Sequence, residues 1–216
     1  MLKLILAAIA LGLAGPAFAG DSQSNSVRNG IAAYKSGDFH QAQELLTPIA
    51  MAGDLRAKRY VAYILLDHDA KDAFDPDRAV GLLSDAAKQG DYAALIKLEE
   101  LRQEGLAFSP SLDDIIEVET HRASMGDPVL AWRLAKRYEY GDGVVPSNEE
   151  AMRWLKVAAA APAAEFPKSG EAAYKLCMMH AGMGASADMR AAKTWCAEAA
   201  ERGEAAAAVM LGRLAP

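Results

Sequence analysis

The hydrophobic positions of this chain recur with the spacing of one face of an α-helix, at i, i+3, i+4, i+7 and i+8. Two kinds of helical segment alternate along the sequence. A segment of the first kind carries Leu130, Leu134, Ala135 and Tyr138, and one of the second kind carries Ala151, Trp154, Leu155, Ala158 and Ala159. The pattern predicts short amphipathic helices in pairs, and therefore an all-α fold.

The helix pairs form a repeat. In most copies an apolar residue is followed eleven places later by a glycine and an acidic residue. The copies start at Ala42, Ala79, Ile115, Ala151 and Ala192. In one of them the insertion APAAEFPKS moves the glycine to Gly170. Successive starts are 36 to 41 residues apart, a period typical of helical repeat proteins. The sequence therefore predicts about five helix pairs and a lone closing helix over 204–216.

A helix-capping residue precedes the start of each copy by four places. These residues are Asp38, Asp75, Ser111, Ser147 and Asp188. A side-chain oxygen at such a position accepts a hydrogen bond from a first-turn N–H that has no partner within the helix. Pro76 suits the first helical position after its cap, and Glu150 follows its serine in the spacing of a capping box. The caps predict where five helices begin.

Small residues stand where helices or turns must approach closely. A larger side chain at Ala135, Ala151 or Ala158 would force neighbouring helices apart. Gly141 and Gly143 end one helix and permit the positive φ of a tight turn before the next. This part of the chain is therefore shaped by packing geometry rather than by reactive chemistry.

The same part of the chain resembles the Sel1-like repeat, a slightly longer relative of the tetratricopeptide repeat. The resemblance is carried by Leu130, Leu134, Ala135, Tyr138, Gly141, Gly143, Val144, Ala151, Trp154, Ala158 and Ala159. The first unit is closer to a tetratricopeptide hairpin, through Gly30, Gly37, Phe39 and Ala42. The resemblance covers about Ser26 to Leu214. It implies a single domain over 26–216, a right-handed superhelical solenoid of antiparallel helix pairs that binds proteins or peptides without catalytic chemistry of its own.

The N-terminal residues predict a secretory signal peptide. Lys3 carries the only charge, an apolar run fills Leu4 to Leu13, and Ala17-Phe18-Ala19 provides the small residues that signal peptidase requires. The alternative, a transmembrane anchor, needs a longer apolar run. We therefore expect cleavage after Ala19, a short flexible N-terminus over 20–25, and a periplasmic or secreted mature protein.

The charge balance restricts the class of partner. The whole chain has a formal net charge of −6, and loss of Lys3 with the signal peptide makes it −7. Such an acidic balance argues against nucleic acid and provides no polybasic patch for a membrane. With the resemblance, it implies an envelope or periplasmic protein as partner, bound through a peptide segment, with no membrane insertion after signal cleavage.

Neither catalytic residues nor a cofactor are expected. The histidines lie in different units, and none has a partner at the spacing of a catalytic triad: His40, His68, His121 and His180. The acidic segment DHDAKDAFDPD, 67–77, lacks the glycine and the closing glutamate of a calcium loop, which favours a solvated turn. A cell-wall-directed hydrolase, suggested for some cysteine-rich relatives, is the enzymatic alternative.

The two cysteines allow two interpretations. Cys177 and His180, with Met178 or Met183, offer soft ligands for copper, although packing within a helix, with methionine filling gaps, is the favoured interpretation. In the repeat register Cys177 and Cys196 belong to one helix pair, so in an oxidising compartment they form either a disulfide or two buried thiols. A disulfide there would contribute about 3 kcal/mol in the chain-entropy model.

A partner is expected on the concave face of the stack, which the first helices of the pairs line. The register places these side chains there: Arg59, Tyr63, Trp132, Lys136, Tyr174 and Met178. Tyr, Trp, Arg and Met are residue types that anchor interfaces, although packing on neighbouring helices is an alternative for Trp132 and Tyr174. Two further candidates are a basic patch of Arg133, Lys136 and Arg137, suited to an acidic segment, and the insertion over Pro162 to Ser169.

Overall fold

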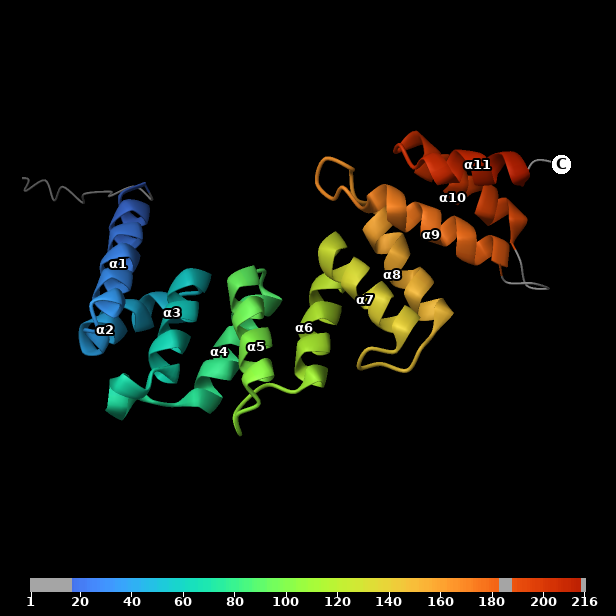
Figure 1. Ribbon diagram of the computed structural model, residues 1–216. Coiled ribbons are helices and arrows are strands. Elements are labelled where there is room, and N and C mark those ends of the chain that lie inside the picture. The colour runs from blue at the N-terminus through green and yellow to red at the C-terminus, as the bar shows by residue number, and fades with distance from the viewer. Residues whose placement is uncertain (1–16, 183–187, 215–216) are drawn as a thin grey trace, which may run out of the picture. The chain divides into compact units, whose positions relative to one another are not determined.

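The computed structural model describes residues 17–182 and 188–214, and all regular secondary structure in those ranges is helical (Figure 1). The helices are α1 (Ala17–Lys35), α2 (Phe39–Met51), α3 (Leu55–Leu66), the 3-10 helix η1 (His68–Ala73), α4 (Pro76–Lys88), α5 (Tyr92–Glu104), α6 (Leu112–Ser124), α7 (Pro128–Tyr140), α8 (Asn148–Ala160), α9 (Ser169–Gly182), α10 (Met189–Glu201) and α11 (Ala205–Arg213). The all-α fold of paired helices predicted by the sequence is confirmed.

Most of the predicted signal peptide, residues 1–16, lies outside the described residues. Helix α1 begins at Ala17 and includes residues 20–25, for which the sequence predicts a flexible segment. No proline interrupts the chain between Ala17 and Lys35, so the helix can continue through them. Among the described residues, no helix is long and apolar enough to cross a membrane. Cleavage after Ala19 stays a prediction.

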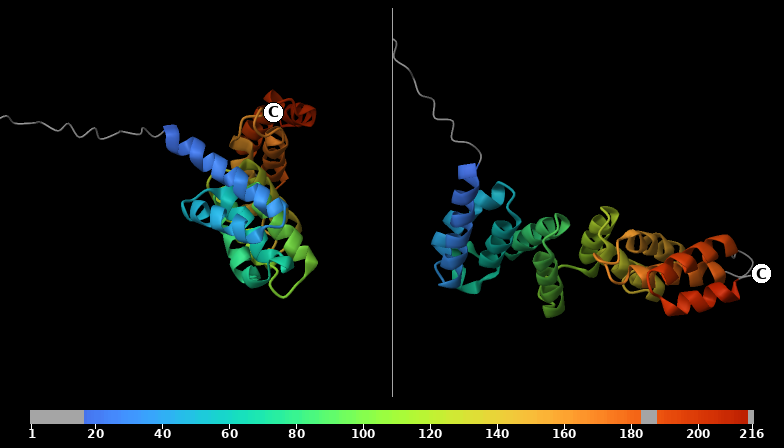
Figure 2. Two further views of the ribbon diagram at one scale, coloured as in Figure 1. Left: turned by 90° about the vertical axis from the view of Figure 1, so that its left-hand side faces the viewer. Right: turned by 90° about the horizontal axis from the view of Figure 1, so that it is seen from above.

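The helices group into two compact units, one ending at Leu82 and the other beginning at Leu83, within α4. In the first unit α1 and α2 pack on each other and on α3. In the second unit each helix from α5 to α11 contacts the next, and α9, α10 and α11 lie side by side in every view (Figures 1 and 2). The single domain predicted over 26–216 stays a prediction for the chain as a whole.

The predicted capping residues begin their helices. Each accepts a hydrogen bond from the backbone N–H three residues later, at 3.0 Å for Asp38, 3.2 Å for Asp75, 3.1 Å for Ser111, 3.2 Å for Ser147 and 2.9 Å for Asp188. Such a cap contributes about 1 kcal/mol because it satisfies a donor that the helix cannot. The helix starts are therefore encoded locally.

The reciprocal capping box forms at a different helix from the predicted one. The N–H of Ser147 donates to the carbonyl of Tyr138 instead of to Glu150. At α6 both halves are present, since the Asp114 carboxylate accepts from the N–H of Ser111 at 2.8 Å while the Ser111 hydroxyl accepts from the N–H of Asp114. The carbonyl of Tyr138, near the end of α7, takes the N–H of Ser147 that the Glu150 carboxylate would otherwise accept from.

The first residue of each copy is buried, with at most 1 % of its surface exposed: Ala42, Ala79, Ile115, Ala151 and Ala192. The residue four places later is also fully buried in each copy: Leu46, Leu83, Glu119, Leu155 and Cys196. These two positions lie on the buried face of the second helix of each predicted pair. Burial of a large apolar side chain there stabilises the fold by about 1.5–3 kcal/mol. One copy places a carboxylate on this face.

The turn between α7 and α8 requires its glycines. Gly143 has φ of +74°, and a Cβ atom there would lie 2.5 Å from Leu112 Cδ2 and 2.8 Å from Ile116 Cδ1. Gly141 has φ of +75° and ends α7. The predicted tight turn is therefore present, and it packs closely on α6.

Candidate partner-binding site

Helix α7 carries the cations of the predicted basic patch, but two of the three are neutralised. Arg137 Nε donates to Glu119 Oε2 at 2.7 Å, and Arg137 Nη1 lies 2.7 Å from Asp142 Oδ2. Arg133 Nη2 lies 2.9 Å from Glu119 Oε1. The prediction of a basic patch for an acidic segment is therefore wrong at this place, since Lys136 alone of the three has no ion pair within the described residues.

Glu119 is the residue that balances these arginines, and its side chain is 0 % exposed. Removal of a carboxylate from water is costly unless cations and hydrogen bonds replace the lost hydration. Arg137 supplies Nε and Nη2, the latter at 3.3 Å, while Arg133 supplies a third donor and also pairs with Glu99. Helices α5, α6 and α7 are thus joined by one ion network.

The Arg137 guanidinium is held in its charged form. Burial by itself lowers the pKa of Arg137, but the hydrogen bonds and charge of Glu119 and the charges of Asp142 and Glu99 outweigh burial and raise the pKa. Because the side chain stays charged and makes a fork-like contact with one carboxylate, its position is strongly constrained. Asp142 ties the turn after α7 to the same guanidinium.

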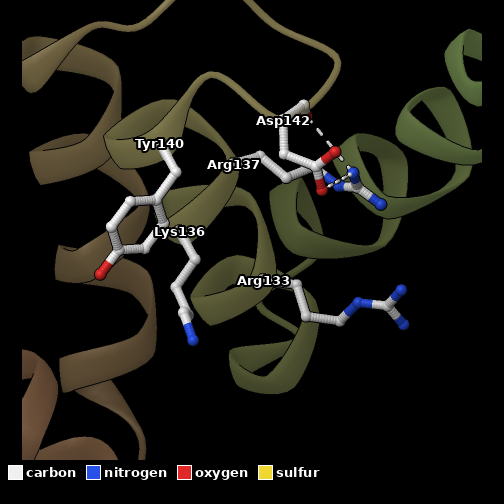
Figure 3. Close-up of a pocket in the computed structure, with 5 residues that line it drawn as sticks. All are labelled: Arg133, Lys136, Arg137, Tyr140 and Asp142. Carbon is white, nitrogen blue, oxygen red and sulfur yellow. Dashed lines mark hydrogen bonds and ion pairs between the residues drawn. The ribbon is translucent and has the colours of Figure 1, made fainter.

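Beside this network lies a hollow of about 240 Å³, lined by Arg133, Lys136, Arg137, Tyr140 and Asp142, which we name the α7 hollow. Figure 3 shows the Asp142 carboxylate against the Arg137 guanidinium, whereas Lys136 and Tyr140 extend away from that pair. Both arginines at its wall are paired with carboxylates. A partner therefore meets a concave surface with the Tyr140 ring and the Lys136 ammonium group, rather than a strong positive potential.

The Tyr140 side chain adds an accessible aromatic surface to the α7 hollow. The residue is 72 % exposed, at the last position of a well-packed helix. Tyrosine on a rigid element can bury a large area in a partner at low entropic cost, and its hydroxyl can donate a hydrogen bond. The arrangement suits the binding of a protein segment.

Sequence reasoning missed Tyr140, Glu119 and Asp142. A signal for Glu119 exists, because it occupies the register position where other copies have leucine or cysteine. An acidic residue at a buried apolar position implies a cation from a neighbouring helix. The sequence alone does not show which cation that is, and exposure of Tyr140 follows only from the packing around α7.

Trp132 is buried rather than presented to a partner. It is 6 % exposed, and its ring centroid lies 6.4 Å from that of Phe166 in the insertion. The ammonium groups of Lys168 and Lys175 lie 5.5 and 5.8 Å from the Trp132 ring centroid. The prediction of an exposed anchor at Trp132 is therefore wrong, because the inserted loop, rather than a neighbouring helix as in the alternative, packs its Phe166 ring against the indole.

The insertion itself is anchored by the same contact. Phe166 is buried, and its N–H donates to the carbonyl of Pro162 at 2.9 Å. The charged residues of the loop, Glu165 and Lys168, stay exposed. At least part of the insertion therefore stabilises the second unit, and a role for its exposed residues stays a prediction.

The other predicted binding residues lie on three helices in two units. Lys136 is exposed in the α7 hollow, Met178 of α9 is 43 % exposed, and Tyr174 is half-buried. In the first unit, the guanidinium carbon of Arg59 lies 5.8 Å from the Tyr63 ring centroid. A binding role for these residues stays a prediction.

The two cysteines are joined in a disulfide between α9 and α10, with Cα atoms 5.1 Å apart. This bond removes the Cys177 thiolate on which the copper interpretation depends. The other proposed sulfur ligands are the exposed Met178 and Met183, and the latter lies outside the described residues. Within the described ranges no three His, Cys, Asp or Glu residues gather in a way that could hold a metal ion.

The acidic segment 67–77 forms the 3-10 helix η1 and the start of α4. Two of its aspartates accept hydrogen bonds from backbone N–H groups, Asp67 from Asp69 at 3.0 Å and Asp75 from Arg78. These carboxylates serve as caps, as expected for a turn.

Comparison with known proteins relates the chain to a repeat family. The sequence matches the Sel1 repeat over residues 57–91, 128–162 and 170–204. In the structure these ranges include most of α3 and α4, of α7 and α8, and of α9 and α10. No curated protein matches the sequence.

Two solved structures are similar to the chain. A Sel1 repeat protein from Oxalobacter formigenes shares 21 % identity and a TM-score of 0.45, with 87 % of this chain and 74 % of that one covered. A protective antigen present in uropathogenic Escherichia coli strains, which displays an SLR fold, shares 20 % identity and a TM-score of 0.47, with 89 % of this chain and 41 % of that one covered.

Proposed function

Since the chain belongs to the Sel1 repeat family, we propose that it is an adaptor that binds a segment of a partner protein in the α7 hollow. Sel1 repeat proteins are generally scaffolds for protein–protein interaction. Their helix pairs bury the apolar faces between neighbouring repeats. Partners are therefore recognised by exposed side chains that do not take part in this packing. In this chain Lys136 and Tyr140 are such side chains.

The observation that carries the proposal is the combination of an exposed tyrosine with a wall held by a buried ion pair. Tyr140 is 72 % exposed, and the wall beside it is held by the buried pair of Arg137 and Glu119. Preorganisation of a surface lowers the entropy lost on binding, which leaves more of the contact energy as affinity. The partner is expected to insert an apolar or hydrogen-bonding side chain beside Tyr140.

The proposal includes export and the absence of catalytic chemistry. The charge, apolar run and small residues of 1–19 support export to the periplasm or beyond, and the generally non-enzymatic character of the family supports a binding role. Export is tested by intact mass of the protein from the periplasmic fraction, which should begin at Gly20. A cytoplasmic protein that retains Met1 would contradict this part.

The binding site is tested by photo-crosslinking in living cells. A photoreactive amino acid in place of Tyr140 should give a discrete adduct, whereas the same group in place of Met189, an exposed residue of α10, should not. Mass spectrometry of the adduct identifies the partner. If the two positions give the same adducts, the α7 hollow is not the binding site.

The identified partner then permits a quantitative test. Tyr140→Ala should weaken its affinity by about thirtyfold, the effect of a hot-spot side chain worth about 2 kcal/mol. Met189→Ala is the matched control, because it also truncates an exposed large side chain. Unchanged affinity in Tyr140→Ala, with helical circular dichroism intact, would reject the site.

A further inference from the structure

A second surface of different chemistry lies in the first unit, between α1 and α3. It is a groove of about 500 Å³ lined by Arg28, Asn29, Ile31, Ala32, Lys35, Arg56, Arg59 and Tyr60, which we name the α1–α3 groove. Its volume lies within the range of about 300–1,000 Å³ that ligand clefts occupy. Helices α1 and α3 pack directly on each other, and each forms one wall of the groove.

Every charged residue that lines the α1–α3 groove is cationic. Two of the cations, Arg28 and Lys35, come from α1, and Arg56 and Arg59 come from α3. The chain as a whole has a net charge of −6, so this concentration of positive charge runs against its composition. Among the described acidic residues of this unit, Asp38 and Asp54 accept hydrogen bonds from the first turns of α2 and α3, and Asp67, whose charge acts on Tyr34, accepts one from the N–H of Asp69.

The cations on α1 share one face of the helix. Arg28, Ile31, Ala32 and Lys35 follow the spacing i, i+3, i+4 and i+7. The Arg28 guanidinium donates to the neutral side chain of Asn25 at 2.7 Å, which orients it without cancelling its charge. The seven steps from Arg28 to Lys35 rise about 10 Å along the helix.

The two arginines of α3 have different surroundings. Arg56 lies in the first turn of α3, where the helix dipole disfavours a positive charge. Arg59 is supported from below, because its guanidinium carbon lies 5.4 Å from the Tyr60 ring centroid and 5.8 Å from that of Tyr63. Stacking on two rings restricts the arginine to few orientations.

An aromatic cluster supports that wall. The Tyr34 ring lies 5.5 Å from the Tyr60 ring and 6.3 Å from the Tyr63 ring, between centroids, and 5.9 Å from the Phe39 ring. Tyr60 itself lines the groove, so a bound segment meets an aromatic surface as well as the cations. Anchored rings beneath an arginine make the site preorganised for an anionic ligand.

From these observations we propose that the α1–α3 groove binds a short acidic segment of a partner protein, in which about three successive extended residues place carboxylates against Arg28, Lys35 and Arg56. About three residues fit because an extended chain advances about 3.3 Å per residue along the 10 Å wall. Carboxylates gain charge-assisted hydrogen bonds from arginine. The cationic wall extends over only about 10 Å, so it offers few contacts to a nucleic acid backbone or a membrane surface.

The proposal is tested by fluorescence anisotropy with the purified protein. The probe is a labelled peptide Gly-Ser-Asp-Asp-Asp-Ser-Gly, and its counterpart with three asparagines keeps the shape without the charge. The protein should bind the aspartate peptide with an affinity that falls as salt is raised, and should bind the asparagine peptide at least about tenfold more weakly. Equal binding of both peptides would overturn the proposal.

Single charge deletions locate the site. Lys35→Gln and Arg56→Gln change exposed side chains, so the fold should be kept, as circular dichroism will show. Each should weaken binding of the aspartate peptide by about fivefold, and the two together by about twenty-fivefold. The matched control is Arg190→Gln, which removes an exposed cation from α10 in the other unit and should leave affinity within about twofold. An equal loss in the control would show nonspecific attraction and reject the groove.

Two further measurements separate the alternatives. Vesicles of phosphatidylglycerol should not compete with the aspartate peptide, and competition that Lys35→Gln with Arg56→Gln removes would assign the groove to a lipid surface and overturn the proposal. Tyr140→Ala should leave peptide binding unchanged. The α1–α3 groove and the α7 hollow can therefore fail independently.

Discussion

Glu119 and Leu155 occupy the same position in two successive copies of the repeat, four residues after a buried start, and both are fully buried. Leu155 is stabilised there by the loss of apolar surface to water and needs no particular partner. Glu119 loses its hydration in the same place and depends on the guanidinium groups of Arg133 and Arg137. The repeat thus determines that the position is buried. The side chains of the neighbouring helix determine whether an apolar or a charged side chain can be buried there.

The comparison also bears on function. The matched pair α7–α8 contains Leu155, whereas α6, which contains Glu119, lies outside the ranges that match the Sel1 repeat. The departure from the repeat places an ion network directly behind the α7 hollow. A buried ion pair seldom adds stability over apolar packing but can select one arrangement of its surroundings. In this chain, that arrangement is the wall beside Tyr140.

The largest effect is expected when Glu119 is left without its cations. Arg133→Met with Arg137→Met should lower the free energy of unfolding by about 4 kcal/mol at neutral pH, because a buried carboxylate remains without compensation. The measurement is urea unfolding followed by circular dichroism. A loss below about 1 kcal/mol would show that water reaches Glu119.

A smaller loss is expected at the apolar member of the comparison. Leu155→Ala should lower the free energy of unfolding by about 3 kcal/mol, through lost burial and the cavity left behind. The same unfolding experiment should show no dependence of this loss on pH, since no charge is exposed or buried. Met189→Ala, at an exposed site of α10, serves as the control and should change stability by less than about 0.5 kcal/mol.

The smallest effect is expected when Glu119 is converted to the residue found in the other copies. Glu119→Leu, added to Arg133→Met and Arg137→Met, should restore the unfolding free energy to within about 1 kcal/mol of the original protein, because apolar packing replaces a buried ion network. Affinity for the partner bound beside Tyr140 should stay low. Recovery of both stability and affinity would show that the network has no role in shaping the hollow.

The amino-acid sequence by itself determined the helices and their order. Asp38, Ser147 and Asp188 begin helices through hydrogen bonds to N–H groups three residues away, and Gly141 ends one through its own backbone angles. The register of buried starts, such as Ala42 and Ala192, follows from the helical period. Such features depend on neighbours within one or two turns, so a pattern in the chain records them.

Only the tertiary structure decided which side chains remain available to a partner. Arg137 is neutralised by a carboxylate 18 residues away and Arg133 by one 34 residues away, while Phe166 from the insertion covers Trp132. The α1–α3 groove likewise gathers cations from two helices that a third separates in the chain. Charge and exposure depend on distances in space between residues far apart in sequence, and these distances exist only once the helices have packed.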